Sequence, residues 1–179
     1  MYAMKADTTT LSVAIRLAEH LQVHLPRRAA WTALDAALAE VFGHRLFTVL
    51  VYDDCEQRLV RVHSSRPDIN PVGGCKAVLP GLWTRQVLIE GAAYIGRTRE
   101  DLRDVFADHE VLFSIGCESV LNIPIRRGGI TLGSLNLLNG PGAYRATDIP
   151  TAKLFAQLVS AAMHAEYMEI TGRPSLPLL

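Results

Sequence analysis

The cysteines are the first residues in this sequence whose type could support chemistry. Cys55, Cys75 and Cys117 are the three cysteines of the 179-residue chain, and their spacing is wide and unequal. No two of them form a C-x-x-C pair, which excludes a zinc knuckle and a thioredoxin-like redox motif. In a reducing compartment an odd number at this spacing favours free thiols over a disulfide framework. Cys117 follows a glycine turn, and the simplest prediction for it is a small, partly buried thiol.

A second candidate group is Asp108-His109-Glu110, which lies between two short predicted helices. Our preferred interpretation is structural: Asp108 caps the free N–H groups at the start of the second helix. The alternative places His109 at the mouth of a pocket near Cys117, as a hydrogen-bond donor or proton carrier. No second pair of ligands at a useful spacing accompanies His109 and Cys117, so we expect no metal site.

Two asparagines, Asn122 and Asn136, lie among apolar residues on neighbouring predicted strands. A buried amide must find hydrogen-bond partners. A two-residue hairpin loop at Gly128-Gly129 would put the amides on opposite faces of the sheet, and a three-residue loop would put them on one face. Two roles stay open for the pair, namely ligand contact and the fixing of a nearby loop backbone.

The segment between the strands is rich in aromatic and basic residues. The aromatic members are Trp83, Tyr94, Phe106 and Phe113, and the basic members are Arg85, Arg97, Arg99 and Arg103. The aromatic rings could stack on a flat ligand, although core packing is the more common role of such residues. The arginines could meet an anionic ligand, but a solvated helix face is the simpler interpretation. The motifs of serine hydrolases, P-loops, zinc proteases and dinucleotide-binding proteins are absent from the sequence.

Helices are predicted at both ends of the chain. Apolar residues recur at helical spacing over residues 10–25 and 27–42, and Gly43 is placed to end the second helix. The expected apolar stripe of the first helix consists of Leu11, Ile15, Ala18, Leu21 and Leu25. At the other end, one long helix is predicted from Thr147, as its cap, to about Ile170.

Two β-hairpins are predicted between these helices, from residues 46–52 with 59–63 and from residues 120–125 with 132–138. Residues 64–81 are predicted to be a loop, and short helices are expected over 82–90, after a start signal at Thr98 with Asp101, and over 109–115. Hairpins with helices at both ends favour an α+β domain, in which helices cover the faces of an antiparallel sheet.

Composition sets limits on function. Hydrophobic residues make up 49% and charged residues 20% of the chain, and the formal net charge is zero. These values are typical of one globular domain, and a neutral balance gives no general attraction to nucleic acid or to anionic lipid. The N-terminus lacks a signal-peptide pattern and no apolar run approaches the ~20 residues of a membrane span. We therefore expect a soluble, cytoplasmic protein without a nucleic-acid or membrane partner.

Several phrases in this order resemble a GAF domain over roughly residues 27–165. They are Phe47 to Asp53 (FTVLVYD), Val120 to Ile125 (VLNIPI), Leu132 to Leu138 (LGSLNLL) and Tyr144-x-x-Thr147-Asp148. The resemblance implies a sheet of about six antiparallel strands, with helices on one side and a small-molecule pocket on the other under residues 64–117. It also implies a homodimer formed through the first and last helices. The phrase Phe106-x-Asp108-His109-Glu110, with Ser114-x-Gly116-Cys117, is similar to stand-alone proteobacterial members without a settled activity.

One branch of that family reduces free methionine sulfoxide with cysteine thiols, and this gives an alternative function. A thiolate attacks the sulfoxide, and a second thiol resolves the sulfenic acid as a disulfide. This sequence departs from the branch, because Cys75 and Cys117 are far apart in the chain. Three carboxylates of the branch are also replaced, and the corresponding positions here are Val120, Asn136 and Leu138.

The sequence thus predicts a non-catalytic, small-molecule-binding sensor domain that acts as a homodimer, and a thiol-dependent reductase is the alternative. A third possibility is a structural dimer whose pocket is filled by its own side chains. Residues 1–26 are expected to form a helix in the dimer contact, 27–170 the domain and 171–179 a tail, with any signal passed to a partner protein. The ligand and any cofactor stay unnamed. The expected ligand-binding residues are Trp83, Tyr94, Phe106, His109, Phe113, Cys117, Asn122 and Asn136.

Overall fold

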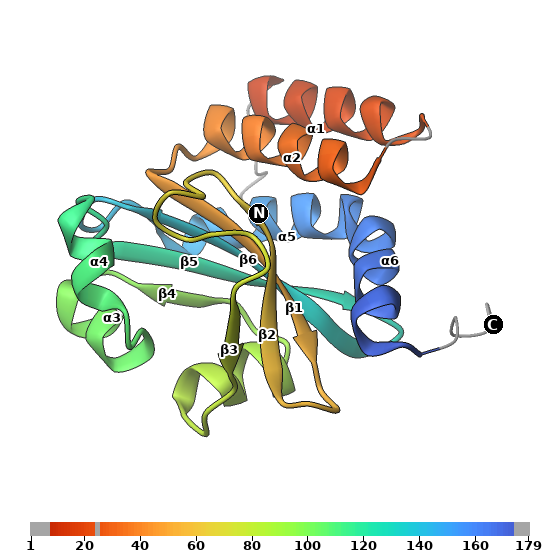
Figure 1. Cartoon of the computed structure of the whole chain (residues 1–179). Coiled ribbons are helices and arrows are strands. Elements are labelled where there is room, and N and C mark those ends of the chain that lie inside the picture. Colours follow the sequence, from red (N-terminus) through yellow and green to blue (C-terminus); the bar gives the residue numbers. More distant parts are fainter. Residues whose placement is uncertain (1–7, 24–25, 174–179) are drawn as a thin grey trace.

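Six antiparallel strands form one sheet in the order β3-β2-β1-β6-β5-β4 (Figure 1). The strands are β1 (Leu46–Asp53), β2 (Arg58–Ser64), β3 (Cys75–Ala77), β4 (Tyr94–Gly96), β5 (Ser119–Arg127) and β6 (Ile130–Asn139). The structure is a computed structural model, and it describes residues 8–23 and 26–173. The sheet and its flanking helices confirm the predicted α+β class and the expected number of strands.

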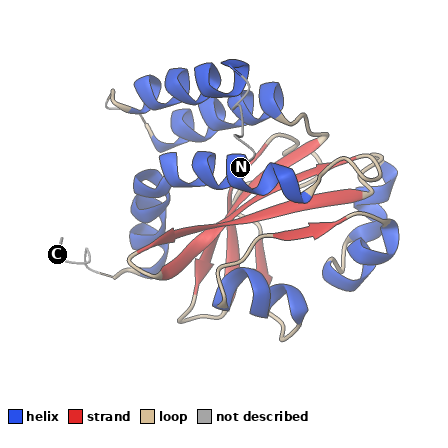
Figure 2. Cartoon of the chain, turned by 180° about the vertical axis from the view of Figure 1, so that it is seen from behind, coloured by secondary structure: helices blue, strands red, loops and turns tan. Residues whose placement is uncertain are grey.

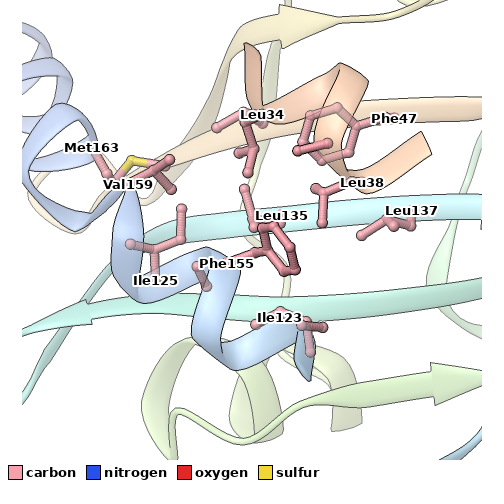
Figure 3. Packing of buried hydrophobic residues seen from close by; sticks show 14 of the residues in the cluster. Leu34, Leu38, Phe47, Ile123, Ile125, Leu135, Leu137, Phe155, Val159 and Met163 are labelled. Carbon is pink, nitrogen blue, oxygen red and sulfur yellow. The ribbon is translucent and has the colours of Figure 1, made fainter. Parts of the chain in front are cut away.

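Four helices cover one face of the sheet in two layers (Figure 2). They are α1 (Thr8–Leu21), α2 (Arg27–Val41), α5 (Ile149–Leu158) and α6 (Ser160–Thr171). Helices α2, α5 and α6 pack on the strands, and α1 packs on the outside of α2. Figure 3 shows Leu34 and Leu38 of α2 packed with Phe155 of α5 over the strands. Burial of each such side chain contributes about 1.5–3 kcal/mol to folding.

Shorter helices cover the opposite face. They are the π-helix η1 (Thr84–Ile89), α3 (Arg99–Val105) and α4 (His109–Ser114). Their apolar side chains form a second hydrophobic cluster, separate from the one under the four long helices. It contains Leu46 and Leu138 from the sheet and Val87, Leu102 and Leu112 from the short helices. Asp101 fixes the start of α3, because its backbone N–H donates to Thr98 Oγ1 while its carboxylate accepts from the Thr98 N–H. This confirms the predicted helix start.

Other predictions need correction. The segment 64–81 is not wholly a loop, because β3 pairs with β2 at the edge of the sheet. The long C-terminal helix is broken at Val159, and Thr147 does not cap its start, because Thr147 lies inside the short 3-10 helix η2 (Ala146–Asp148). Asp148 occupies the N-cap position of α5 without a capping hydrogen bond to it, and its carboxylate instead accepts from the Arg145 N–H. The tail predicted over 171–179 lies outside the described residues from position 174 onward, and Thr171 still belongs to α6.

The predicted stripe of the first helix is only partly correct. Leu11 and Ile15 are 51% and 49% exposed, whereas Val13, Ala14 and Leu17 form the buried face of α1. Leu21 packs against the core as expected. The predicted end of this helix at Leu25 lies outside the described residues. Helix α1 therefore carries a second apolar stripe that faces away from its own chain.

Two β-bulges set which side chains face each layer. In the hairpin of β5 and β6, Ile125 pairs with Gly133 but Arg126 pairs with Thr131, so β6 carries one extra residue. In the hairpin of β1 and β2, Val49 pairs with His63 but Leu50 pairs with Arg61, so β2 also carries one extra residue. Each extra residue reverses the side-chain alternation of its strand on one side of the bulge.

None of the helices in the described ranges is both long enough and apolar enough to cross a membrane.

Candidate functional site

A small cavity lies on the sheet face opposite the four long helices. It has a volume of about 30 Å³, which accommodates on the order of two water molecules. Strands β1, β2, β3 and β6 supply one side, the loop before β3 contributes Asn70, and the α3–α4 segment supplies the roof. The lining residues are Leu46, Thr48, Leu50, Arg61, Asn70, Lys76, Phe106, Asp108, Leu112, Asn136 and Leu138.

Arg61 is the most unusual residue of this lining, because a cation is buried there without an anion. Its exposed fraction is 6%, and none of the ion pairs in the described part of the chain includes it. Its Nη1 donates to the Pro71 carbonyl over 3.1 Å, while its buried Nε has no hydrogen-bond partner. Burial lowers the pKa of Arg61, and the carboxylate of Asp108 opposes that effect.

The backbone around Arg61 explains how the chain holds this side chain. The Arg61 N–H donates to the Gly74 carbonyl, and the Arg61 carbonyl accepts from the Gly73 N–H. A Cβ atom at position 74 would lie 2.8 Å from Arg61 Nη1, so the guanidinium packs where Gly74 leaves room. The loop before β3 therefore fixes both the backbone and the head group of Arg61.

An ion pair closes the outer side of the cavity. Lys76 Nζ on β3 lies 2.8 Å from both carboxylate oxygens of Asp108, which lies in the loop between α3 and α4. The Lys76 and Asp108 side chains are 40% and 32% exposed. The predicted capping role of Asp108 is wrong, because its side chain makes no capping hydrogen bond to α4 and binds Lys76 instead.

Asn136 and Asn122 form a buried amide pair at the inner end of this face. The two residues are directly opposite in the register of β5 and β6, and Asn122 Nδ2 donates to Asn136 Oδ1 over 2.6 Å. Asn136 Nδ2 reaches the carbonyl and Oγ1 of Thr48, each at 3.3 Å, and Trp83 Nε1 donates to Asn122 Oδ1 over 3.0 Å. Both amides are therefore held by neighbouring protein groups.

The hairpin loop does not by itself decide which faces of the sheet Asn122 and Asn136 occupy. The hairpin loop is the two-residue Gly128-Gly129, since Arg127 pairs with Ile130. Such a loop alone would have put Asn122 and Asn136 on opposite faces. The bulge in β6 shifts the register by one residue and brings them to the same face.

Of the eight predicted ligand-binding residues, Phe106 and Asn136 line the cavity. Asn122 and Trp83 adjoin it through the amide pair. The other aromatic members and the cysteine, which are Tyr94, Phe113 and Cys117, are packed in the second hydrophobic cluster. His109 is not in the lining: its Nδ1 lies 2.8 Å from the Phe106 carbonyl, and its ring packs on Phe113. The structure does not bring these eight residues together into one site.

The cysteines are separated by the sheet. Cys75 lies on β3 and Cys117 lies just before β5. These strands are four positions apart in the sheet, which corresponds to about 19 Å at the usual distance between neighbouring strands. A disulfide needs Cα atoms closer than about 7 Å. Cys75 is exposed, whereas burial raises the pKa of Cys117 to about 11.

Sequence reasoning missed Arg61, Lys76, Asn70 and Thr48 as cavity residues. Lys76 and Asn70 lie in the segment interpreted as a loop, where no periodicity indicates direction. Arg61 did carry a signal, because it is two residues from Leu59 in a predicted strand and therefore shares the face of a buried leucine. A charge on the apolar face of a strand is the pattern that would have identified it.

A second polar cluster lies on the helix-covered face. Asp35 of α2 accepts from His44 Nε2 through one oxygen and from His63 Nε2 through the other, each at 2.8 Å. Burial opposes the charged form of Asp35, but the two histidine hydrogen bonds outweigh it and lower the pKa of Asp35 to about 2. The cluster joins α2, the loop that follows it, and β2, and we assign it a structural role.

One further cluster could offer metal ligands at the turn after β1. Asp53, Asp54 and Cys55 place one ligand atom each within 4.8 Å of one another. These groups already have cationic partners, because Arg58 binds Asp53 over 2.9 Å, and Arg173 binds Asp54 over 3.2 Å and Cys55 Sγ over 2.8 Å. We therefore assign no metal to this turn.

A family model described as the GAF domain matches residues 24–164. Similar solved structures include the GAF domains of phosphoenolpyruvate-protein phosphotransferases from Acinetobacter (12% identity, TM-score 0.72, 94% of this chain and 99% of that chain) and from Coxiella burnetii (14% identity, TM-score 0.71, 93% and 99%). A free methionine-R-sulfoxide reductase from Neisseria meningitidis, solved with its substrate, is similar at 15% identity and a TM-score of 0.62, over 94% of this chain and 98% of that chain. At these identities the likeness to the solved structures shows the fold. No curated protein matches the sequence.

Proposed function

Because the chain belongs to the GAF domain family, we propose that it is a non-catalytic sensor domain that binds a small molecule in the cavity between the sheet and the α3–α4 segment. The observation that carries this proposal is the polar lining of the cavity, where Arg61, Asn70 and Thr48 lie inside a largely apolar layer. Buried polar groups are costly unless they have partners, and a few polar groups in a mostly apolar pocket are typical of a binding site.

The size of the cavity places a condition on binding. A volume of about 30 Å³ is far below the roughly 300–1,000 Å³ of most ligand pockets, so the roof must move when a ligand larger than a few heavy atoms enters. The roof is formed by Phe106, Asp108 and Leu112 from short elements at one side of the sheet. The alternative, a structural dimer whose pocket is filled by its own side chains, predicts that the roof stays closed to all ligands.

Two features of the thiols support a non-catalytic role. Attack on a sulfoxide requires a thiolate, and with a pKa of about 11 Cys117 is ionised in on the order of one molecule in 10,000 at pH 7. The exposed Cys75 is four strand positions away and is too distant to resolve a sulfenic acid on Cys117. We therefore expect no reduction of free methionine sulfoxide by the purified protein. The reductase becomes the better assignment if that assay is positive.

The proposed homodimer uses the outer surface of α1 and α2. Leu11 and Ile15 form the exposed apolar stripe of α1, and Val23 beyond the helix is 63% exposed. A groove of about 580 Å³ lies where α1 and α2 meet and is lined by His20, Pro26, Arg28, Ala29, Thr32, Ala33 and Ala36. Exposed apolar surface of this kind on a helix is typical of a protein interface. We propose a second copy of this chain as its occupant.

Native mass spectrometry of the purified protein, compared with its denatured mass, tests both parts of this proposal. We expect a dimer that carries a small additional mass, which is lost on denaturation. A dimer without added mass, together with no thermal stabilisation by a broad library of metabolites, would contradict the sensor function and favour the structural dimer. The cytoplasmic location and the signalling partner expected from the sequence stay predictions.

A further inference from the structure

The guanidinium of Arg61 is buried without an anionic partner, although a buried charge is costly unless it is paired. We propose that the ligand of the cavity is a small carboxylate and that its carboxylate group binds the Nε–H of Arg61. This inference rests on the proposed function and names the chemical class of the ligand. Arg61 lines the cavity, its buried Nε has no hydrogen-bond partner, and its side chain makes no ion pair within the described ranges.

The charges around the cavity favour an anion over a neutral molecule. Arg61 and Lys76 are the cations of the lining and Asp108 is its anion, and Lys76 already pairs with Asp108 at 2.8 Å. Arg61 is thus left with one positive charge in a buried position. Such a charge is costly unless it is paired. A monoanionic ligand would neutralise it.

The donors available fit a carboxylate group. A guanidinium presents N–H groups in a planar fork that matches the two oxygens of a carboxylate. Nη1 of Arg61 donates to the Pro71 carbonyl, and the buried Nε–H, which has no partner, forms with Nη2 the edge of the fork that would face the ligand. Thr48 adds a second donor, because its Oγ1 accepts from Asn136 Nδ2 and its hydroxyl hydrogen is still available.

The rest of the lining fits the carbon skeleton of such a ligand. Leu46, Leu50 and Leu138 present apolar surface from the sheet, and Leu112 presents it from the roof. A short aliphatic acid places its carboxylate on Arg61 and Thr48 and its methyl or methylene groups on these leucines. A fully polar anion such as phosphate would leave part of its hydration unreplaced on this surface.

The entrance lies at the ion pair between Lys76 and Asp108. Both side chains are partly exposed, and they join the edge strand β3 to the loop between α3 and α4. Ion pairs with this exposure contribute little to stability, so their separation is an inexpensive way to enlarge the cavity. Once separated, Lys76 becomes a second cation beside the bound carboxylate.

Nuclear magnetic resonance of the arginine side chains tests the proposal on the unaltered protein. The Nε–H signal of Arg61, assigned through the Arg61→Gln variant, is followed while formate, acetate or propionate is added, with sodium chloride as the control at equal ionic strength. We expect a saturable shift of this signal with the carboxylates and none with chloride. No shift with any carboxylate would overturn the proposal, and a larger response to inorganic phosphate would replace carboxylate by phosphate as the ligand class.

Variants give a second, quantitative test. We expect Arg61→Gln to bind acetate about 10- to 100-fold more weakly by calorimetry, because one charge-assisted hydrogen bond is lost. The matched control is Arg97→Gln, which removes the same charge from an exposed position in the loop after β4 and should bind as the wild type does. Circular dichroism establishes that both variants fold. If Arg61→Gln fails to fold, the resonance measurement on the wild type decides the question.

Failure of this inference is distinguishable from failure of the proposed function. If the native mass spectrum shows a bound neutral molecule while carboxylates leave the Arg61 signal unmoved, the protein is a sensor of another ligand class. If no added mass is found and no carboxylate binds, both proposals fail.

Discussion

Asn122 and Asn136 face each other across β5 and β6, and a single hydrogen bond of 2.6 Å joins their side chains. This pair connects the segment around the π-helix η1 with the cavity on the same face of the sheet. Asn122 accepts from Trp83, next to the π-helix, and Asn136 reaches Thr48, which lines the cavity. Asn122, which lies outside the lining, therefore orients Asn136 and through it Thr48, both of which line the cavity.

The first prediction concerns the energetics of this pair. Asn122→Leu should lower the free energy of unfolding by about 1–3 kcal/mol, because the Trp83 Nε1–H loses its acceptor and Asn136 loses a donor. The double variant with Asn136→Leu should cost less than the sum of the two single changes, because no amide of the pair is then left without its partner. Urea unfolding of the four proteins measures the coupling. Strict additivity would show that the two amides act independently.

The second prediction concerns acid stability. The pKa of Asp35 is about 2 in the folded protein, below its ordinary value of 3.8, so its two histidine contacts stabilise the fold above about pH 4. That contribution, about 2 kcal/mol, should be lost as the pH falls from 4 to 2. Asp35→Asn should flatten the pH dependence of the unfolding free energy in this range, and the exposed Asp104→Asn should leave it unchanged. An identical acid transition in both variants would contradict the assignment.

The third prediction concerns thiol reactivity. Cys55 and Cys75 are exposed and should react with iodoacetamide in the native protein, whereas the buried Cys117, with its raised pKa, should react only after unfolding. In a variant that carries Cys55→Ser and Cys75→Ser, modification should therefore require denaturant. Mild peroxide should produce no disulfide between Cys75 and Cys117, which peptide mass mapping can check. Detection of that disulfide would show that the sheet opens far more than the structure indicates.

The fourth prediction concerns the proposed dimer. Leu11→Glu combined with Ile15→Glu should convert the dimer to monomer, because two charges would be buried without partners in the interface. Light scattering coupled to size-exclusion chromatography measures the change. The control is Ile89→Glu, since Ile89 is 70% exposed on η1 at the opposite face of the sheet. A wild-type monomer, or a dimer that survives both charges, would remove α1 from the interface.

Local patterns in the sequence predicted most of the elements. The two hairpins, the start of α3 at Thr98 and the end of α2 before Gly43 depend on residues within a few positions of one another. Strand β3 was not predicted, because three residues at a sheet edge are too few to show the alternation of apolar and polar residues that indicates a strand. The break between α5 and α6 at Val159 was not predicted, because the helical pattern of apolar residues continues on both sides of it.

The site was much less predictable, and the reason is the side-chain alternation of strands. Arg61 and His63 are two residues apart, so an uninterrupted strand would present both on one face. The bulge in β2 instead places Arg61 beside Leu50 at the cavity and His63 with Asp35 under α2. Similarly, the bulge in β6 decides that Asn122 and Asn136 meet.

The sequence by itself determined the fold class, the two hairpins and the presence of helices on both faces, because these follow from short-range periodicity and turn residues. The tertiary structure decided which polar residues share a cavity. Lys76 meets Asp108 and Arg61 lies buried beside them because β3 pairs with β2 and the α3–α4 segment folds over the sheet. Those contacts join residues that are distant in the sequence, as Lys76 and Asp108 are at a separation of 32, where local patterns carry no information.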